Sequence, residues 1–370
     1  MPLLVVLLYI FLVVVAIQAL FYLGVYTKFV FSKDKQSDHN SLPVSVIICA
    51  KNEAENLKTF LPSICEQDYP NFEIVLINDD STDDTLDVIE AFANQYSNIK
   101  IVNVKNIEAF WGNKKYALTL GIKAAKNEYL LFTDADCKPM SSHWISEMCS
   151  HFTKEKSVVL GYGGYSKIKN SFLNKLIRYE TLVTAVNYFS FALSGMPYMG
   201  VGRNLAYTKA EFFNANGFIN HIKVRSGDDD LFVNQVATAK NTACTFSENS
   251  FTTSLPKKTY KAWYLQKRRH VSTAQHYKPL HKFLLALLYI SNLLFWVLAV
   301  VLFVAQIKWQ IILGAFVLRL SLQYLILGMA SKKLKESDLI LIFPLLEFFL
   351  IIIQLTIFIN NILSKPKHWK

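Results

Sequence analysis

Apolar residues are concentrated in a few long blocks of the chain. Between the first two blocks, residues 43–254 have the mixed polar and apolar pattern of an ordinary globular domain. A helix needs about 20 apolar residues to cross a bilayer, and each block approaches or exceeds that length. The blocks are residues 2–30, 283–305, 309–329 and 339–363. We therefore expect a membrane protein with a globular domain after its first membrane segment.

The first block differs from a cleaved signal peptide. It lacks a positively charged start, a short apolar core and a small-residue cleavage site. We therefore expect residues 1–31 to form an uncleaved anchor. Lys28, Lys33 and Lys35 lie at its end, and basic residues mark the cytoplasmic side of a membrane segment. We therefore expect the chain to be anchored in a bacterial inner membrane, with the next domain on the cytoplasmic side.

The C-terminal membrane region, residues 283–363, has charges inside its apolar segments. Arg319 lies in the middle of one segment, and Pro344 and Glu347 interrupt the next. Charges at membrane depth are costly and usually face protein or water, so we expect two or three spans. Lysines that indicate the inner side follow both segments, at positions 332, 333, 335, 365, 367 and 370. If every segment crosses the membrane, the ends of these two consecutive segments cannot both lie on the inner side, and the topology stays open.

Apolar runs alternate with helical stretches in the central domain, residues 43–254. Helices are expected at residues 52–67 and 114–125, with Ser81 or Thr82 as the cap of another. This alternation predicts an α/β fold with a mostly parallel sheet covered by helices. Ligands of such sheets bind beyond the carboxyl ends of the strands, where acidic residues cluster in this sequence. The predicted strands are residues 44–50, 73–78, 99–104 and 129–133.

Asp134 and Asp136 follow the last of these strands. In extended backbone, residues i and i+2 point to the same side, so two carboxylates would face one space and repel each other. A divalent cation removes this conflict, and Mg²⁺ or Mn²⁺ favours carboxylate oxygens together with substrate phosphates. The pair is a candidate metal site, although a solvated acidic turn more often explains so short a motif.

Other acidic groups also lie at the ends of predicted elements. Asp79 follows the second strand, where it either supports a turn or accepts hydrogen bonds from a nucleoside. Asp228, Asp229 and Asp230 form a run of like charges. One member of this run could take a proton from an acceptor hydroxyl as a general base. Another could begin a helix, where a carboxylate favours the helix dipole.

Residues 255–282 form a basic stretch that we expect to be an amphipathic interfacial helix. Because no aspartate or glutamate occurs between residues 249 and 335, the stretch suits anionic lipid headgroups. Trp263 is expected to face lipid. Arg269 could neutralise a departing diphosphate, because a guanidinium matches phosphate geometry. Gln266 and His270 share its helical face.

The chain from about residue 43 to residue 276 resembles the family 2 glycosyltransferases, which have the GT-A fold. It is also similar to membrane-bound ceramide glucosyltransferase-like enzymes and polysaccharide synthases. Each motif is weak alone, but their order and spacing together are specific. The motifs are CAKNE (49–53), INDDST (77–82), KKYAL (114–118), FTDADC (132–137), GRN (202–204), SGDDDL (226–231) and QKRRH (266–270).

The resemblance implies a role for each matched position. Asp228 would be the catalytic base, with Asp229 as the alternative if the register shifts by one residue. The metal ligand would be Asp136, assisted by Asp134, and the cofactor Mg²⁺ or Mn²⁺. Donor-binding residues would be Asp79, Lys114, Asp134, Gln266 and Arg269. Acceptor-binding residues would be Gly202, Asn204 and His270.

The resemblance also implies an inverting reaction by direct displacement, without a covalent intermediate. The donor would be a nucleotide-sugar, with UDP as the default nucleotide. The acceptor would be a lipid or lipid-linked glycan at the lipid bilayer. His270 replaces the tryptophan that usually bounds the acceptor site in the family, which leaves the acceptor type open.

Alternative functions remain at this point. A small processive polysaccharide synthase would need enough spans to build a channel. A non-catalytic membrane scaffold with this fold would not need the acidic residues, which are intact here. The formal net charge of +11 suits an anionic partner, but we expect no nucleic-acid partner because zinc-finger and RNA-binding signatures are missing. The five scattered cysteines favour a reducing compartment over disulfides or structural zinc.

Overall fold

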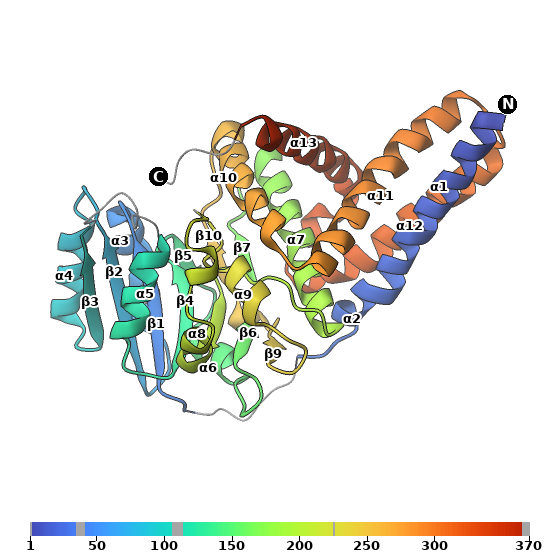
Figure 1. Cartoon of the computed structure of the whole chain (residues 1–370). Helices are drawn as coiled ribbons and strands as arrows, with labels where there is room; N and C mark the ends of the chain where they lie inside the picture. The colour runs from blue at the N-terminus through green and yellow to red at the C-terminus, as the bar shows by residue number, and fades with distance from the viewer. Residues whose placement is uncertain (1, 35–40, 106–113, 225, 365–370) are drawn as a thin grey trace. The chain divides into compact units, whose positions relative to one another are not determined.

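A computed structural model describes residues 2–34, 41–105, 114–224 and 226–364 (Figure 1). It contains two compact units, and each is described by itself. The sheet unit consists of Lys33–Ser166 and Gly195–Pro256. The helical unit consists of Met1–Ser32, Lys167–Ser194 and Lys257–Pro366. Residues 167–194 fall inside the predicted globular domain in sequence, yet they pack with the helical unit.

A mixed seven-stranded sheet forms the centre of the sheet unit. Its strand order is β3-β2-β1-β4-β8-β6-β9, and the first four strands of this order are parallel. β8 runs antiparallel to both β4 and β6. The strands are β1 (Val44–Ala50), β2 (Phe72–Asp79), β3 (Ile99–Val104), β4 (Tyr129–Asp134), β6 (Val158–Leu160), β8 (Leu205–Thr208) and β9 (Thr242–Cys244). This architecture confirms the predicted α/β fold with a mostly parallel sheet.

A second, three-stranded sheet has the order β5-β10-β7. Its strands are β5 (Cys137–Pro139), β10 (Thr252–Ser254) and β7 (Gly163–Tyr165). The helices of the sheet unit are α3 (Ala54–Cys65), α4 (Thr85–Gln95), α5 (Lys114–Ala124), α6 (Trp144–Cys149), α8 (Lys209–Asn214) and α9 (Asp230–Val236). Short 3₁₀ turns occur at Ile219–His221 and Glu248–Ser250. Because β5 begins one residue after Asp136, this small sheet supports the region around the predicted metal pair.

Strand burial explains why the sequence pattern was readable. Val46, Ile48 and Leu76 are fully buried in one core cluster. Parallel strands that are covered on both faces have continuous apolar sequences, and β1 has the predicted bounds. β3 also has the predicted bounds, although it is a partly buried edge strand. One local prediction is wrong, because Asp84 precedes the first turn of α4 in place of Ser81 or Thr82.

The loop before α4 is held by the chain beyond β1. The Thr82 hydroxyl donates to Asn52 Oδ1 at 3.3 Å, and the Asn52 backbone N–H donates to Ser81 Oγ at 3.0 Å. These bonds commit the two hydroxyl residues to a neighbouring loop. The long-range contact therefore overrides the local capping preference that the sequence suggested.

The helical unit contains four helical segments that are long and apolar enough to cross a membrane: Leu3–Val30, Pro279–Val304, Trp309–Lys333 and Ser337–Leu363. The N-terminal segment includes a π-helical turn. Its elements are α1 (Pro2–Leu20), η1 (Phe21–Tyr26) and α2 (Thr27–Val30). The later elements are α7 (Phe172–Leu193), α10 (Tyr260–Thr273), the 3₁₀ turn Ala274–His276, α11 (Pro279–Val304), α12 (Trp309–Lys333), the 3₁₀ segment Ser337–Ile342 and α13 (Phe343–Leu363).

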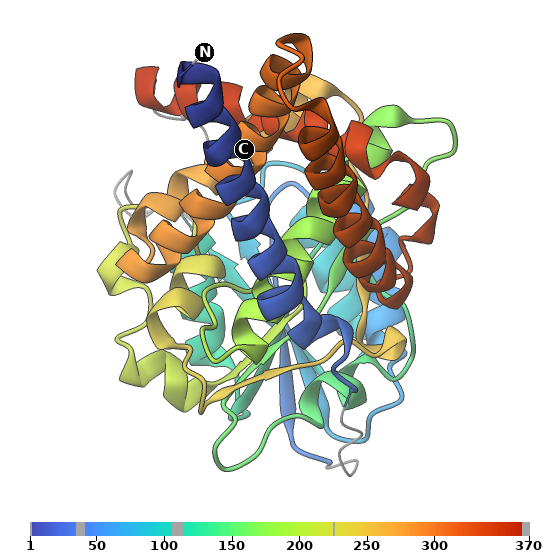
Figure 2. The same ribbon diagram turned by 90° about the vertical axis from the view of Figure 1, so that its right-hand side faces the viewer.

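Apolar packing joins the first and second candidate spans. Figures 1 and 2 show α1 running alongside α11, and Phe11 stacks on Phe295 with ring centroids 5.8 Å apart. α7 packs against α13 and α2 and is not among the candidate spans of the described chain. On α10, Trp263 is buried. The prediction that Trp263 faces lipid is therefore wrong, because its ring packs within the protein.

The charges within the predicted C-terminal spans face protein. Arg319 is fully buried and forms an ion pair with Glu347. Its Nε donates to Gln18 Oε1 at 2.6 Å, and Nη1 donates to Gln323 Oε1 at 2.8 Å. An unpaired charge at this depth would be costly. The pairing explains how these two segments can be apolar helices despite their charges.

Candidate active site

The predicted acidic residues of the sheet unit converge at the carboxyl ends of its parallel strands. Cys49 at the end of β1 is in register with Asp134 at the end of β4. Ala50 of β1 is in register with Asn78 of β2, next to Asp79. Parallel neighbours bring these ends to one edge of the sheet. The loop before α9 joins them, because Asp228 lines the same small pocket as Asp134.

Lys114 connects two of the predicted residues. Its Nζ lies 2.7 Å from Asp134 Oδ1 and 3.1 Å from Asp228 Oδ2. Burial opposes the charged ammonium, but the Asp134 and Asp228 carboxylates raise the pKa of Lys114 well above its ordinary value. Lys114 therefore stays positively charged. The structure brings together Lys114, Asp134 and Asp228, which are separated by up to 114 residues in sequence.

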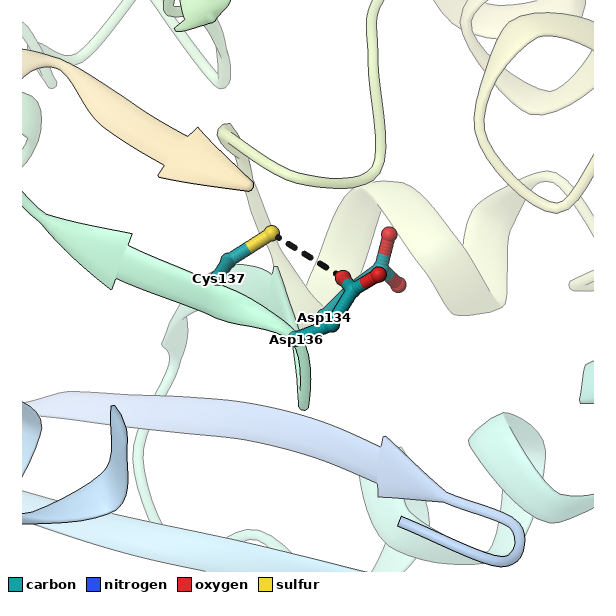
Figure 3. Close-up of side chains that lie close together, drawn as sticks. All are labelled: Asp134, Asp136 and Cys137. Carbon is teal, nitrogen blue, oxygen red and sulfur yellow. Dashed lines mark hydrogen bonds between the residues drawn. The ribbon is translucent and has the colours of Figure 1, made fainter. Parts of the chain in front are cut away.

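Asp134 and Asp136 form a candidate metal centre with Cys137 (Figure 3). One ligand atom from each residue lies within 4.8 Å of the others. Burial raises the pKa of Asp136, and the nearby Asp134 and Glu53 carboxylates raise it further. A divalent cation would relieve this repulsion. The carboxylate pair therefore fits a hard cation such as Mg²⁺ or Mn²⁺, which prefers oxygen ligands.

Cys137 contributes differently from the two aspartates. Its Sγ lies 2.9 Å from Ser254 Oγ and 3.5 Å from Asp136 Oδ1. Burial raises the pKa of the Cys137 thiol well above its ordinary value, and the acidic neighbours act in the same direction. The neutral thiol is a weak ligand for a hard cation. We therefore assign the ligand role to the carboxylates and a packing role to Cys137.

Two cationic side chains near these acids were not predicted to belong to the site. Arg203 is stacked on Tyr165, with its guanidinium carbon 4.3 Å from the ring centroid. Burial opposes its charge, but Tyr165, Cys137, Asp134 and Asp136 together raise the pKa of Arg203 above its ordinary value. Lys51 Nζ lies 4.0 Å from Asp79 Oδ2. Both positions fall within motifs of the resemblance, but their charge was not connected to the acids because only the fold brings them close.

Asp79 lies at the end of β2 and is almost completely buried. Burial raises the pKa of Asp79, whereas the nearby Lys51 lowers it. The carboxyl group is therefore in an environment where a hydrogen-bond donor from a ligand would be strongly favoured. This position is compatible with the predicted contact to a nucleotide base, which stays a prediction.

The structure distinguishes Asp228 from Asp229. Asp229 Oδ2 accepts the Gly202 backbone N–H at 2.7 Å, and Oδ1 accepts the Asp230 N–H at 2.7 Å. Asp229 thereby caps α9 and holds the Gly202 loop. Burial raises the pKa of Asp229 to about 7, and Asp228 and Asp230 contribute in the same direction. Asp228 instead points to Lys114, so this difference favours Asp228 as the proton acceptor.

The predicted acceptor contacts in the sheet unit have different placements. Gly202 lines the pocket and donates its backbone N–H to Asp229. Asn204 is fully buried. Its Nδ2 donates to the Tyr162 and Ser250 carbonyls at 2.9 and 2.6 Å, and its Oδ1 accepts from Trp144 Nε1 at 2.9 Å. These bonds favour a scaffold role for Asn204 over the expected acceptor contact, because both amide hydrogens are already donated.

Gln266, Arg269 and His270 lie on α10 of the helical unit. Burial lowers the pKa of Arg269 relative to its ordinary value, but a guanidinium remains charged under physiological conditions. Gln266 Oε1 is buried without a hydrogen-bond donor among the residues that the structure describes. The donor and acceptor roles of these three residues stay predictions.

Comparison with known proteins identifies relatives of the sheet unit. Residues 45–218 match the model of the glycosyl transferase family 2. Over 93 residues the chain is 39% identical to a cholesterol galactosyltransferase of Borreliella burgdorferi, covering 25% of each chain. Over 125 residues it is 31% identical to an Escherichia coli β-1,3-glucosyltransferase named for UDP-Glc and GlcNAc-diphosphoundecaprenol, covering 33% of this chain and 45% of that protein. The matches thus span less than half the length of these relatives.

A solved structure extends the likeness in fold. The mannosyltransferase PcManGT from Pyrobaculum calidifontis, in complex with GDP-Man and Mn²⁺, superposes with a TM-score of 0.57 at 16% identity. The superposition covers 91% of this chain and 99% of that protein. At this level of identity, the likeness concerns the fold, which is GT-A with accompanying membrane-type helices in this chain.

Proposed function

We propose that this chain is a member of the glycosyl transferase family 2, whose model its residues 45–218 match, and that it transfers one sugar from a nucleotide-sugar to a lipid or lipid-linked acceptor. The observation that carries this proposal is the meeting of Lys114, Asp134 and Asp228 at the carboxyl edge of the sheet. This group offers a cation for a diphosphate and a carboxylate for an acceptor hydroxyl.

Donor binding uses the acids at the ends of β2 and β4. Asp79 accepts hydrogen bonds from the nucleotide base, and Lys114 pairs with the diphosphate as it departs. Asp134 and Asp136 would hold Mg²⁺ or Mn²⁺. When bound, that cation neutralises the negative charge that develops on the leaving diphosphate. The relatives support a nucleotide-sugar donor, because UDP-Glc and GDP-Man appear in their names.

Asp228 acts as the general base in a single displacement. A carboxylate oxygen of Asp228 takes the proton of the acceptor hydroxyl while the hydroxyl oxygen bonds to the anomeric carbon. The bond from that carbon to the diphosphate breaks, and the configuration inverts. Lys114 holds Asp228 on one side at 3.1 Å. Asp229, which also lines the pocket, accepts the Gly202 backbone N–H and holds that loop in place.

A lipid acceptor is supported by the helical unit and by the relatives. The described chain has four apolar helical segments of membrane-spanning length. Two relatives are named for a sterol and for a polyprenyl diphosphate, which are both membrane lipids. Lys33 follows the first segment, and basic residues favour the cytoplasmic side. We therefore place the reaction at the cytoplasmic face of a membrane.

The test is a donor and acceptor screen with the purified full chain in nanodiscs. Release of nucleoside diphosphate is measured for a panel of UDP- and GDP-sugars with Mg²⁺ or Mn²⁺, and lipid products are analysed by mass spectrometry. We expect one donor to support addition of a single sugar to a lipid. A ladder of products would favour a processive synthase, and no transfer with any donor would contradict the proposal.

A further inference from the structure

The helical unit contains a cavity of about 210 Å³. Its wall is contributed by α1 with η1, α7, α10, α11, α12 and α13, all within this one unit. Leu285, Leu288, Leu350 and Phe358 make much of this wall apolar. Since a water molecule occupies about 30 Å³ of the liquid, the cavity can hold several waters or part of a lipid.

Polar side chains also line the cavity and lack partners there. The Tyr22 hydroxyl and the Gln354 amide make no hydrogen bond within the described part of the chain. Asn187 Oδ1 accepts from Tyr26 at 2.8 Å, but its amide nitrogen donates to no described residue. A polar group left unpaired in an apolar, membrane-type interior costs free energy. These groups therefore indicate a ligand with hydrogen-bonding capacity.

The backbone of the first membrane segment is irregular at this cavity. η1 is a π-helical turn, and its residues Phe21, Tyr22 and Tyr26 line the cavity. Single π-turns inside α-helices are frequent at functional sites. The Tyr26–Asn187 hydrogen bond connects this turn to α7 and fixes one side of the wall. The irregular turn thus belongs to the construction of the cavity.

The charge of the wall restricts the ligand. Among the described residues that line the cavity, no lysine, arginine or histidine is present, and Glu347 is the one carboxylate. Glu347 is paired with Arg319, whose guanidinium also donates to Gln18 and Gln323. A phosphate placed here would lose its hydration beside a carboxylate without gaining a cation of its own. The wall therefore suits an uncharged ligand.

We propose that this cavity binds an uncharged, hydroxyl-bearing lipid, such as a sterol or a diacylglycerol, rather than a polyprenyl phosphate. Its apolar part packs against Leu288 and Leu350, and its polar group hydrogen-bonds to Asn187, Gln354 and the Tyr22 hydroxyl. That this lipid is also the acceptor rests on the proposed function, and it narrows the acceptor to an uncharged class.

The experiment uses the purified full chain in phosphatidylcholine nanodiscs with photoreactive, clickable lipids. The probes are a cholesterol analogue, a diacylglycerol analogue and an undecaprenyl phosphate analogue. Labelled peptides are identified by mass spectrometry. We expect an uncharged probe to label residues of α7, α11 or α13 at the cavity. We also expect unlabelled uncharged lipid to compete at least tenfold better than undecaprenyl phosphate.

Three variants connect the labelling to the cavity. Val183→Trp fills the space, and we expect labelling by the uncharged probe to fall at least tenfold. Val297→Trp is the matched control, because Val297 is exposed on α11 outside the cavity. Gln354→Leu should fold normally because its amide has no described protein partner. We expect Gln354→Leu to reduce labelling about fivefold, because one hydrogen bond contributes about 1 kcal/mol to binding.

The possible outcomes separate the two proposals. Equal labelling of Val183→Trp and Val297→Trp, or preferential labelling by undecaprenyl phosphate, would overturn the cavity proposal. Nucleotide binding is measured in parallel, and it should be unchanged in all three variants. If the lipid binds in the cavity but receives no sugar while another acceptor does, the cavity is a lipid-binding site but its lipid is not the acceptor. If no acceptor receives sugar, the proposed function fails independently.

Discussion

Each unit of the molecule contains a buried group of charges, and the two groups are built differently. In the helical unit, Arg319 is paired with Glu347, and its guanidinium also donates to the amide oxygens of Gln18, Gln323 and Asn292. In the sheet unit, Lys114 is shared between Asp134 and Asp228, while Asp136 lies beside Asp134 with a raised pKa. The first group is complete without a ligand. The second has acids in excess, and a cation or a ligand proton would relieve it.

This difference separates a structural role from a functional one. A balanced buried ion pair contributes little net stability over an apolar replacement, but its two halves depend on each other. A site with unbalanced carboxylates instead keeps its electrostatic cost until a cation or substrate binds. We therefore expect substitutions in the helical group to change stability and substitutions in the sheet group to change activity.

The largest expected effect is that of Asp228→Asn on turnover. The amide keeps the size of the side chain but cannot accept the hydroxyl proton, and a general base contributes about 10²–10⁴-fold. We expect kcat to fall by this factor while donor binding, measured by calorimetry, is retained. Asp230→Asn is a control in the same acidic run. Full activity of Asp228→Asn would disprove the base assignment and make Asp229 the candidate.

The second prediction concerns the candidate metal centre. Asp136→Asn removes one of the two carboxylates, and we expect a loss of roughly 10²–10³-fold in kcat, comparable to losing one electrostatic contact to the leaving group. The concentration of Mn²⁺ or Mg²⁺ needed for half-maximal activity should rise as well. Glu55→Gln, on the exposed face of α3, is a control. An unchanged metal dependence in Asp136→Asn would argue against this centre.

The third prediction tests the complete group in the helical unit. Arg319→Leu leaves Glu347 buried without its cation, and breaking such a pair typically costs about 3–5 kcal/mol. We expect a marked fall in the unfolding temperature of the detergent-solubilised protein. The double variant Arg319→Leu with Glu347→Leu should recover most of the loss. If single and double variants are equally destabilised, the ion pair is not the source of the effect.

The smallest expected effect is a pH dependence from Asp229. Its pKa is raised from 3.8 to about 7 in the folded protein, so the folded state binds this proton more tightly than the unfolded state. The contribution of Asp229 to stability is therefore most favourable below about pH 4 and declines as the pH rises towards 7. Above pH 7 it is constant and unfavourable.

Asp229→Asn should remove this pH dependence and lose the hydrogen bond from Gly202. We expect the variant to be less stable than the wild type at pH 5. This difference in stability should be smaller by about 2–3 kcal/mol at pH 8, because the wild type loses stability between pH 5 and pH 7. Unfolding temperatures of both proteins at the two pH values measure the change. A deficit that is equal at both values would contradict the pKa shift.

Some features were readable from sequence because they are local. The bounds of β1 agree with the predicted run, since a strand buried on both faces is continuously apolar. The bounds of β3 also agree, although this strand lies at the edge of the sheet and is only partly buried. Asp134 and Asp136 were recognised as a pair from their two-residue spacing, and they do lie together, but Ala135 and Asp136 form a turn after β4 in place of the expected extended backbone. The roles of Arg203 and Lys51 were not foreseen, because their acidic neighbours belong to other strands. The scaffold bonds of Asn204 also come from distant residues.

By itself, the sequence determined the apolar segments, the α/β alternation, the family motifs and the acidic residues at strand ends. These follow from hydrophobic periodicity and short spacings, which involve only neighbouring residues. Only the tertiary structure decided that Asp229 caps a helix while Asp228 faces Lys114, and that Arg319 is neutralised by Glu347. It also decided that tyrosine and amide groups of separate helices line one cavity. Such relations depend on packing between distant segments, where burial makes each unpaired charge or hydrogen bond costly.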